Sequence, residues 1–274
     1  MMNISIGIIG FGNMGSAIGQ LLKVKYQIWI FDINKNKTKN LIDVNLADDA
    51  LDLVSKVDTV ILAVKPQDFD ILLSQIKRYT NGKLIISIAA GITTGYIENQ
   101  LGKTHVIRVM PNLPAKVGQG MICLCKGNFA NDGDLNFAKR IFDNLGKTLL
   151  IEESLMNAVT AISGSGPGYF YHLIKGKQKE EWEDFARKEF IPALSTAAQE
   201  IGFTSEQAQL LAKVTTQGSV ALLRDTELTP ETLCIQVTSK GGTTDAGLKV
   251  LHTIDDLEAS AKAALKRAQE LSKE

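Results

Sequence analysis

Two kinds of hydrophobic pattern divide this chain near residue 152. Before that point, short and nearly continuous apolar runs alternate with stretches that have helical spacing. The runs predict buried strands of a parallel sheet covered on both faces, and the stretches between them predict helices. The expected strands are residues 6–9, 27–31, 58–63, 84–88, 106–110, 121–124 and 148–151. The expected helices are residues 16–23, 34–43, 68–79, 94–101 and 135–145.

After residue 152 the strand signal nearly disappears. Thr204 and Gln207 have the pattern of a capping box ahead of a helix that ends near residue 223, and Thr229 precedes a proline at another helix start. A final helix carries one apolar stripe, formed by Leu257, Ala261, Ala264, Leu265, Ala268 and Leu271. These patterns predict an α/β fold, a doubly wound sheet followed by an all-helical C-terminal domain. Because a small helical domain often completes its core with a copy of itself, we expect a homodimer or a higher homo-oligomer.

The segment between the first strand and the first helix carries three glycines, Gly10, Gly12 and Gly15, in the spacing of a dinucleotide-binding loop. The first glycine permits a tight turn, the second lets the backbone approach a pyrophosphate, and the third lets the helix pack on the strand. Asp32 follows the second strand, where an acid normally binds the ribose of NAD. Residues 1–152 are therefore expected to form a Rossmann-type domain for a nicotinamide or flavin nucleotide. The alternative is a glycine-rich turn with a structural role only.

The amino-acid composition limits the classes of binding partner and the cellular compartment that we expect. The 30 Lys and Arg residues balance the 30 Asp and Glu residues, so net charge does not favour nucleic acid or a membrane surface. The apolar runs are too short to span a bilayer, and we expect no secretory leader. Cys123, Cys125 and Cys234 lack the spacing of metal ligands and are expected to be reduced thiols. We expect a cytoplasmic protein without a metal.

Five later segments, taken in order with the glycine loop, make the chain resemble pyrroline-5-carboxylate reductases. They read AVKPQ at residues 63–67, SIAAGI at 87–92, RVMPNLP at 108–114, SGSGP at 163–167 and TSKGGTTDAGL at 238–248. The resemblance covers residues 4–265. The glycine loop is shared with many dehydrogenases, whereas the Met-Pro-Asn and Ser-x-Gly-Gly-Thr-Thr motifs are much more specific.

The resemblance implies an NAD(P)H-dependent oxidoreductase of proline biosynthesis, which transfers a hydride to the imine carbon of Δ1-pyrroline-5-carboxylate and gives L-proline. It implies catalytic roles for Thr244, whose hydroxyl would contact the ring nitrogen, and for Ser239. Residues 153–274 would form the substrate-binding and dimerisation domain. The substrate would be held by Gly241, Gly242, Thr243, Ser163 and Ser165. The cofactor would be held by Gly10, Gly12, Asn13, Met14, Gly15, Asp32, Ala63, Val64, Lys65, Pro66, Ala89, Met110, Pro111 and Asn112.

Three positions depart from the family pattern. The family usually has proline at Lys240 and alanine at Gly168. Residues 175–187 are an insertion rich in Lys, Glu and Asp that also contains Trp182 and Phe185. It is either a solvated helical extension or a surface that faces a partner and alters the dimer. Tyr169, just after the glycine turn at residues 163–168, is expected to serve packing.

Other functions remain open from the sequence. A β-hydroxyacid dehydrogenase shares the two-domain plan, but neither Lys175 nor Lys179 is followed at the required spacing by an asparagine. A nucleotide-sensing protein without turnover is the other alternative. For the cofactor, Asp32 would oppose a 2′-phosphate and so favours NADH, while Lys35 and Lys37 just downstream could neutralise the phosphate of NADPH.

Overall fold

The computed structural model describes residues 4–273, which form two compact units. In the described part, the first unit contains residues 4–109, 124–144 and 273, and the second contains residues 110–123 and 145–272. The chain passes from one unit to the other within strands as well as after them. Each unit is therefore described separately.

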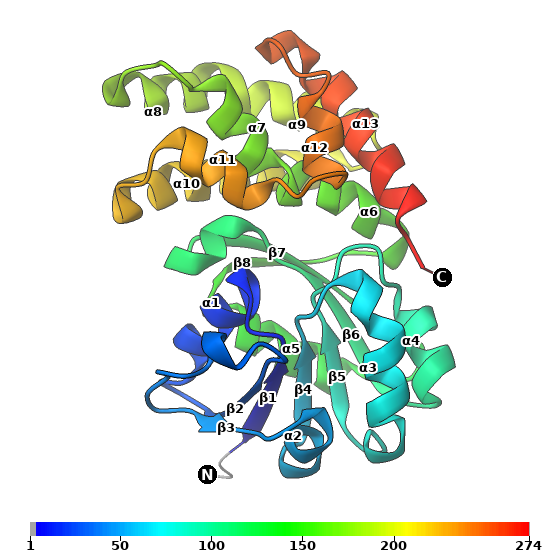
Figure 1. Ribbon diagram of the computed structural model, residues 1–274. Coiled ribbons are helices and arrows are strands. Elements are labelled where there is room, and N and C mark those ends of the chain that lie inside the picture. The colour runs from blue at the N-terminus through cyan, green and yellow to red at the C-terminus, as the bar shows by residue number, and fades with distance from the viewer. Residues whose placement is uncertain (1–3, 274) are drawn as a thin grey trace. The chain divides into compact units, whose positions relative to one another are not determined.

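The strands form one eight-stranded sheet in the order β3-β2-β1-β4-β5-β6-β7-β8 (Figure 1). The strands from β1 to β6 pair in parallel, with Ile8 of β1 placed between Ile30 of β2 and Ile61 of β4. The strand order reverses at β1, and open α/β sheets bind ligands at the carboxyl ends of the strands around such a point. The strand bounds are β1 Ser5–Ile9, β2 Gln27–Phe31, β3 Asn45–Leu46, β4 Thr59–Leu62, β5 Leu84–Ser87, β6 His105–Met110, β7 Gly120–Lys126 and β8 Gly146–Leu150.

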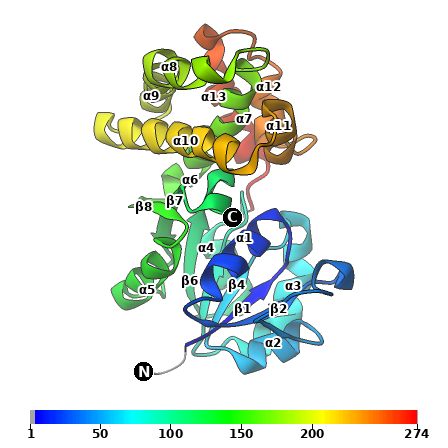
Figure 2. The same cartoon turned by 90° about the vertical axis from the view of Figure 1, so that its left-hand side faces the viewer.

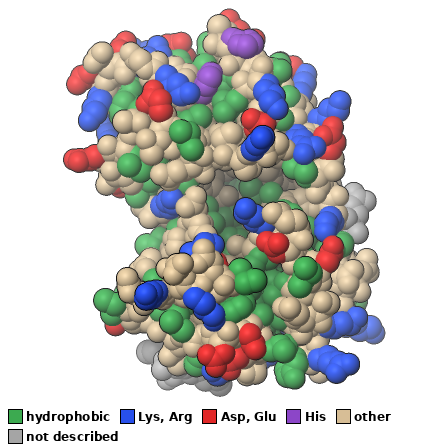
Figure 3. All heavy atoms as spheres, in the orientation of Figure 1, with side chains coloured by type: hydrophobic (Ala, Val, Ile, Leu, Met, Phe, Trp, Pro, Cys, Tyr) green, Lys and Arg blue, Asp and Glu red, His purple; other side chains and the backbone are tan. Residues whose placement is uncertain are grey.

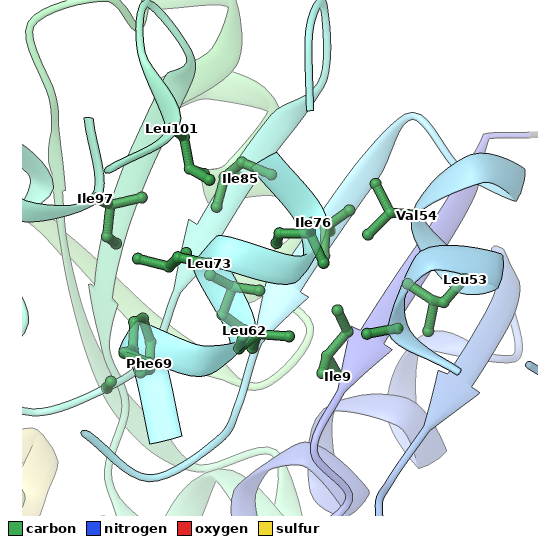
Figure 4. Packing of buried hydrophobic residues seen from close by; sticks show 14 of the residues in the cluster. Ile9, Leu53, Val54, Leu62, Phe69, Leu73, Ile76, Ile85, Ile97 and Leu101 are labelled. Carbon is green, nitrogen blue, oxygen red and sulfur yellow. The ribbon is translucent and has the colours of Figure 1, made fainter. Parts of the chain in front are cut away.

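Apolar side chains from strands and helices form a large buried cluster in the first unit. Figure 4 shows Ile9, Leu62 and Ile85 of the sheet meeting side chains of the helices that cover it. Phe69 of α3 is fully buried there. This packing explains why the buried strands read as continuous apolar runs. The helices of the unit are α1 Asn13–Leu22, α2 Ala50–Lys56, α3 Phe69–Ile76, α4 Thr94–Leu101 and α5 Asp132–Phe142.

The expectation of a helix over residues 34–43 is wrong. Only a single 3-10 turn forms there, at Lys35–Lys37, capped by the Asn34 side chain, which accepts a hydrogen bond from the Asn36 N–H. The segment has no apolar face to bury, and Ile42 remains 72% exposed. The helix of this region comes later, at α2, where Asp49 caps the first turn and Leu53 enters the core. Short β3, which the sequence pattern did not reveal, lies between the two.

The second unit contains most of the helices (Figure 2). The capping box of Thr204 and Gln207 is confirmed at the start of the longest helix, α10, and Thr229 caps α11 as expected. On the last helix, most of the expected stripe is buried, but Leu271 lies at the helix end and is 42% exposed. The helix bounds are α6 Met156–Val159, α7 Gly166–Leu173, α8 Trp182–Phe185, α9 Ile191–Glu200, α10 Ser205–Thr226, α11 Pro230–Val237, α12 Thr243–Leu248 and α13 Leu257–Glu270.

Two π-helical turns interrupt these helices, at Thr160–Gly164 between α6 and α7 and at Ala186–Phe190 between α8 and α9. In the first of them, the Ser165 N–H donates to the Thr160 carbonyl at 2.9 Å, which is the five-residue spacing of a π-helix. One extra residue is thereby accommodated in an otherwise helical segment. Such turns are frequent at functional sites.

The insertion at residues 175–187 is amphipathic. Trp182 and Phe185 are buried, and the Phe185 ring stacks on Phe170 of α7 with 6.3 Å between centroids. Phe170 also meets Phe190 edge to face at 5.2 Å. The opposite face of the insertion carries exposed charged side chains. The expectation of a solvated extension therefore holds for one face only, because the other face is part of the core.

None of the helices in residues 4–273 combines the length and the apolar character that a bilayer crossing requires. Basic and acidic side chains lie interspersed over the face seen in Figure 3. This distribution matches the equal numbers of positive and negative residues in the chain.

Candidate functional site

Two of the three glycines in the loop after β1 have a steric reason to be glycine, and the third leaves open space. Gly10 has a φ of +97°, and a Cβ there would lie 2.6 Å from the carbonyl oxygen of Ala63. A Cβ on Gly15 would lie 2.1 Å from the Gly10 carbonyl oxygen, whereas one on Gly12 would meet nothing within 4 Å. Gly10 and Gly15 thus permit the turn and the close packing of α1. Gly12 leaves open space beside the backbone, as a pyrophosphate would need.

The N-terminus of α1 is suited to an anion. Gly12 is its N-cap and provides no side-chain hydrogen bond, and no acidic residue lies in the first turn. The first residues, Asn13 and Met14, therefore leave their N–H groups without a side-chain acceptor from the cap, at the positive end of the helix. A dinucleotide phosphate fits this end of the sheet.

The segment after β4 lies at the same edge. The Ala63 N–H donates to the Ile9 carbonyl at 2.8 Å, and Ala63 packs on Gly10. Val64 and Pro66 follow as partly buried residues, and Lys65 is exposed. After β5, the loop contains buried Ala89. The first unit thus brings together the expected cofactor residues from three consecutive strands of the sheet, β1, β4 and β5.

Asp32 has internal partners that the sequence did not reveal. Its Oδ2 accepts hydrogen bonds from the Phe11 N–H at 2.7 Å and from Lys37 Nζ at 3.1 Å, and its Oδ1 accepts one from the Asn34 N–H at 2.8 Å. The side chain is only 5% exposed. Burial raises the pKa of Asp32, but the two backbone N–H groups and Lys37 more than offset this and hold it below its usual value. Asp32 is therefore an ionised brace between the glycine loop and the turn after β2.

In the second unit, three hydroxyls from distant segments meet. Thr244 Oγ1, in the first turn of α12, donates to Ser165 Oγ at 3.1 Å, and Thr243 Oγ1 lies 3.3 Å from the same oxygen. Thr244 is 5% exposed and Ser165 is fully buried. Tyr169, which is also fully buried, donates a hydrogen bond to the Ser260 carbonyl at 3.4 Å. Burial raises its pKa far above the usual value, although the Ser165 hydroxyl partly opposes this. A neutral phenol and three hydroxyls can donate and accept protons but carry no charge at neutral pH.

A second polar group lies on the other side of the same helical segment. Asn112 Nδ2 donates to Ser163 Oγ at 3.4 Å, and Thr215 Oγ1 of α10 lies 3.3 Å from that oxygen. Asn112 Oδ1 accepts a hydrogen bond from the Met121 N–H at 2.9 Å, which fixes the orientation of the side-chain amide. Met110 and Pro111 precede Asn112 in the second unit, and the Met110 side chain packs on Gly164.

The turn at Gly241 and Gly242, before α12, is held by hydrogen bonds to neighbouring residues. Gly241 has a φ of +72°, its N–H donates to Asp245 at 3.0 Å, and the Gly242 N–H donates to the Ser239 carbonyl at 2.9 Å. Ser239 is exposed, and its Oγ lies against Gly242. The N–H groups of Gly241 and Gly242 are thus already engaged. The N–H groups of Thr243 and Thr244, at the start of α12, have no intrahelical acceptor.

Two residues of this site carried no clear sequence signal. Thr215 lies in the middle of α10, 52 residues from Ser163 along the chain, and Tyr169 was expected only to pack. A cluster of three or more His, Cys, Asp or Glu side chains that could hold a metal is absent from residues 4–273. Cys123, Cys125 and Cys234 are buried, and none of the three forms a disulfide within the described residues.

Comparisons with known proteins identify the family. Residues 5–91 match the family model described as NADP oxidoreductase coenzyme F420-dependent, and residues 188–274 match the model described as pyrroline-5-carboxylate reductase dimerisation. A pyrroline-5-carboxylate reductase of Aquifex aeolicus (strain VF5) is 33% identical to this chain, over 92% of the chain and 90% of the relative. The chain belongs to the pyrroline-5-carboxylate reductase family. The resemblance inferred from the motifs is thereby confirmed.

Solved structures of pyrroline-5-carboxylate reductases share the fold. The enzyme from Coxiella burnetii matches with a TM-score of 0.67 and 30% identity, over 99% of this chain and 100% of that chain. The pyrroline carboxylate reductase of Plasmodium falciparum, solved with NADP bound, matches with a TM-score of 0.66 and 27% identity over 100% of both chains. The expected α/β fold with a helical C-terminal domain is confirmed. The family also supports a nicotinamide nucleotide as the cofactor.

Proposed function

We propose that this protein reduces Δ1-pyrroline-5-carboxylate to L-proline. The observation that carries the proposal is the buried pair of Thr244 and Ser165, placed beside the first turn of α12 in a chain of this family. The nicotinamide nucleotide, when bound, supplies the hydride. The protein needs no nucleophile for this reaction. Its residues position the imine and deliver one proton to the ring nitrogen.

The hydroxyl of Thr244 is the group proposed to contact the imine nitrogen. Its present acceptor is Ser165 Oγ, so a ring nitrogen nearby would exchange one neutral hydrogen bond for another. The proton that the nitrogen gains on reduction would pass through the same hydroxyls or through water. Tyr169 keeps its proton at neutral pH and donates a hydrogen bond to the Ser260 carbonyl, so it adds no charge beside the Ser165 hydroxyl.

The substrate carboxylate is proposed to lie at the start of α12. Gly241 and Gly242 shape the turn, and the N–H groups of Thr243 and Thr244 are the donors left for an anion. Ser239 supports this turn from its exposed side. Ser163 and Asn112 would hold the neighbouring segment in place.

The cofactor is proposed to bind along the glycine loop, with NADH favoured over NADPH. The loop at residues 10–15, the segment at residues 63–66, and Ala89 form the supporting edge in the first unit. Asp32 places a buried carboxylate where a 2′-phosphate would bring like charge. We further propose a cytoplasmic homodimer or higher homo-oligomer, built on the helical domain that matches the dimerisation model.

The experiment is a direct assay. Purified protein is mixed with Δ1-pyrroline-5-carboxylate and NADH or NADPH, the loss of nicotinamide absorbance is followed, and the product is identified as proline. The reductase proposal fails if folded, nucleotide-binding protein forms no proline with either cofactor. Oxidation of a β-hydroxyacid in place of imine reduction would favour the related dehydrogenase class.

A further inference from the structure

The turn after β2 holds one lysine against the carboxylate of Asp32 and directs the neighbouring lysine elsewhere. Lys37 Nζ lies 3.1 Å from Asp32 Oδ2. Lys35 Nζ donates instead to the Asp48 carbonyl at 2.9 Å and lies 4.9 Å from the centre of the Phe31 ring. Both lysines follow Asp32 closely in the sequence, but only Lys37 contacts its carboxylate in the structure.

Asp32 is largely satisfied by groups of its own chain. Its carboxylate already accepts two backbone N–H groups and one ammonium, and it is 5% exposed. A carboxylate has about four lone-pair positions, so little of its capacity remains for the two hydroxyls of a ribose. The positions of the glycine loop and of the turn depend on these bonds, since the Phe11 N–H is buried with Asp32 as its acceptor.

Lys37, in contrast to Asp32, keeps most of its hydrogen-bonding capacity for a ligand. Its side chain is 45% exposed, and the Asp32 bond takes one of the three N–H donors of an ammonium. The acid after the second strand marks the position of the ribose 2′-oxygen in a Rossmann fold. The ammonium of Lys37, bonded to this acid, is therefore suited to meet the group by which NADPH differs from NADH.

We propose that Lys37 is the residue that admits the 2′-phosphate of NADPH, while Asp32 braces the glycine loop. The pair of Asp32 and Lys37 is neutral in sum, so the site opposes a 2′-phosphate much less than a lone carboxylate would. Loss of Lys37 leaves the carboxylate without its counter-charge and strengthens the preference for NADH. This inference deepens the proposed function by assigning how the cofactor is selected.

The test compares three variants by nucleotide binding, measured as the change in nicotinamide fluorescence on titration with NADH and with NADPH. Lys37→Gln should weaken NADPH binding about tenfold relative to NADH, which corresponds to about 1.4 kcal/mol. Lys35→Gln is the matched control, because it removes the same charge two residues away, and it should leave the ratio within about twofold of wild type. Lys37→Arg keeps the charge and should keep most of the NADPH affinity.

Several results would overturn the inference. They are an unchanged ratio in Lys37→Gln, an equal loss of both nucleotides, or the same shift in Lys35→Gln. Raising the salt concentration provides a second measurement: it should weaken NADPH more than NADH in wild type, and this difference should shrink in Lys37→Gln. Binding needs no turnover, so a protein that shows the ratio shift without forming proline would retain this inference and disprove the reductase proposal.

Discussion

Thr244 Oγ1 and Ser165 Oγ lie 3.1 Å apart although 79 positions separate the two residues along the chain. One stands in the first turn of α12, and the other directly follows the π turn ahead of α7. This contact is buried. On its other side, the methyl group of Thr244 packs against Gly168. The hydroxyl of Thr244 is thus fixed on both sides before any ligand binds.

Thr244→Ala should lower turnover far more than it lowers cofactor binding. Loss of one positioned hydrogen bond to a developing charge costs roughly 2–4 kcal/mol, or about 30- to 1000-fold in rate. Thr244→Ser retains the hydroxyl and should retain much of the rate. The measurement is kcat with both nucleotides, beside nucleotide binding. An alanine variant as active as wild type would remove Thr244 from the proposed chemistry.

Gly168→Ala should disturb the same threonine through packing. A Cβ at this position would lie 2.6 Å from Thr244 Cγ2, and overpacking of this kind costs about 1–3 kcal/mol. The control is Gly95→Ala on α4, where a Cβ would meet nothing within 4 Å and which should be neutral or slightly stabilising. Both are measured by urea denaturation.

A double variant makes the packing prediction sharper. Thr244→Ser removes the methyl group that Gly168→Ala would strike, so the combination should recover a large part of the lost stability. Additive losses in the double variant would show that the strain lies elsewhere, for example against Val237, whose Cγ1 is 3.3 Å from the same Cβ position.

His172 should make the stability of the protein depend on pH near neutrality. Burial, followed by the charge of Lys175 and that of His252, lowers the pKa of His172 below its usual 6.5, although a hydrogen bond with the Leu251 backbone partly opposes this. The folded state thus binds fewer protons than the unfolded state just below pH 6.5, and the free energy of unfolding falls as the pH drops through that region. In His172→Gln the decline between pH 7.5 and 5.5 should be smaller. Equal slopes of Tm against pH in both proteins would contradict this role.

Trp182→Ala tests whether the insertion belongs to the core. The Trp182 side chain is 8% exposed, and its indole N–H donates to the Lys177 carbonyl at 3.3 Å. Truncation of a buried tryptophan costs about 3–5 kcal/mol. Glu180→Ala, on the exposed face of the same segment, should change the free energy of unfolding by less than about 0.5 kcal/mol. A loss below about 1 kcal/mol for Trp182→Ala would mean that the insertion is a loosely attached appendage.

The sequence predicted best those features that depend on neighbouring residues. The glycine loop, the caps at Thr204 and Thr229 and the apolar strands all follow from local chemistry. The helix expected over residues 34–43 failed because helical propensity alone does not hold a segment that has no apolar face to bury. The buried face of the insertion was not predicted, because Phe170, on which Phe185 stacks, lies on another helix.

The sequence singled out residues of the candidate site but did not reveal the hydrogen bonds among them. The motif placed Thr244 and Ser165 in the same site, yet Thr215 meets Ser163 only because α10 packs against the segment that carries Ser163. Asp32 was recognised by its position after a strand. Its occupation by the Phe11 N–H, 21 residues away, depends on the tertiary path of the loop, which no local pattern encodes.

The π turn at Thr160–Gly164 has a consequence for how this site can vary in evolution. Ser163 bonds Asn112 and Thr215, whereas Ser165 bonds the threonines of α12, so the extra residue of the turn sets how both serines are directed relative to α6. Each residue of an α-helix turns the chain by about 100°. Deletion of one residue before Ser163 would restore a regular helix but shift both serines relative to the helix that precedes them. Point substitutions can therefore accumulate around this turn more readily than changes in its length.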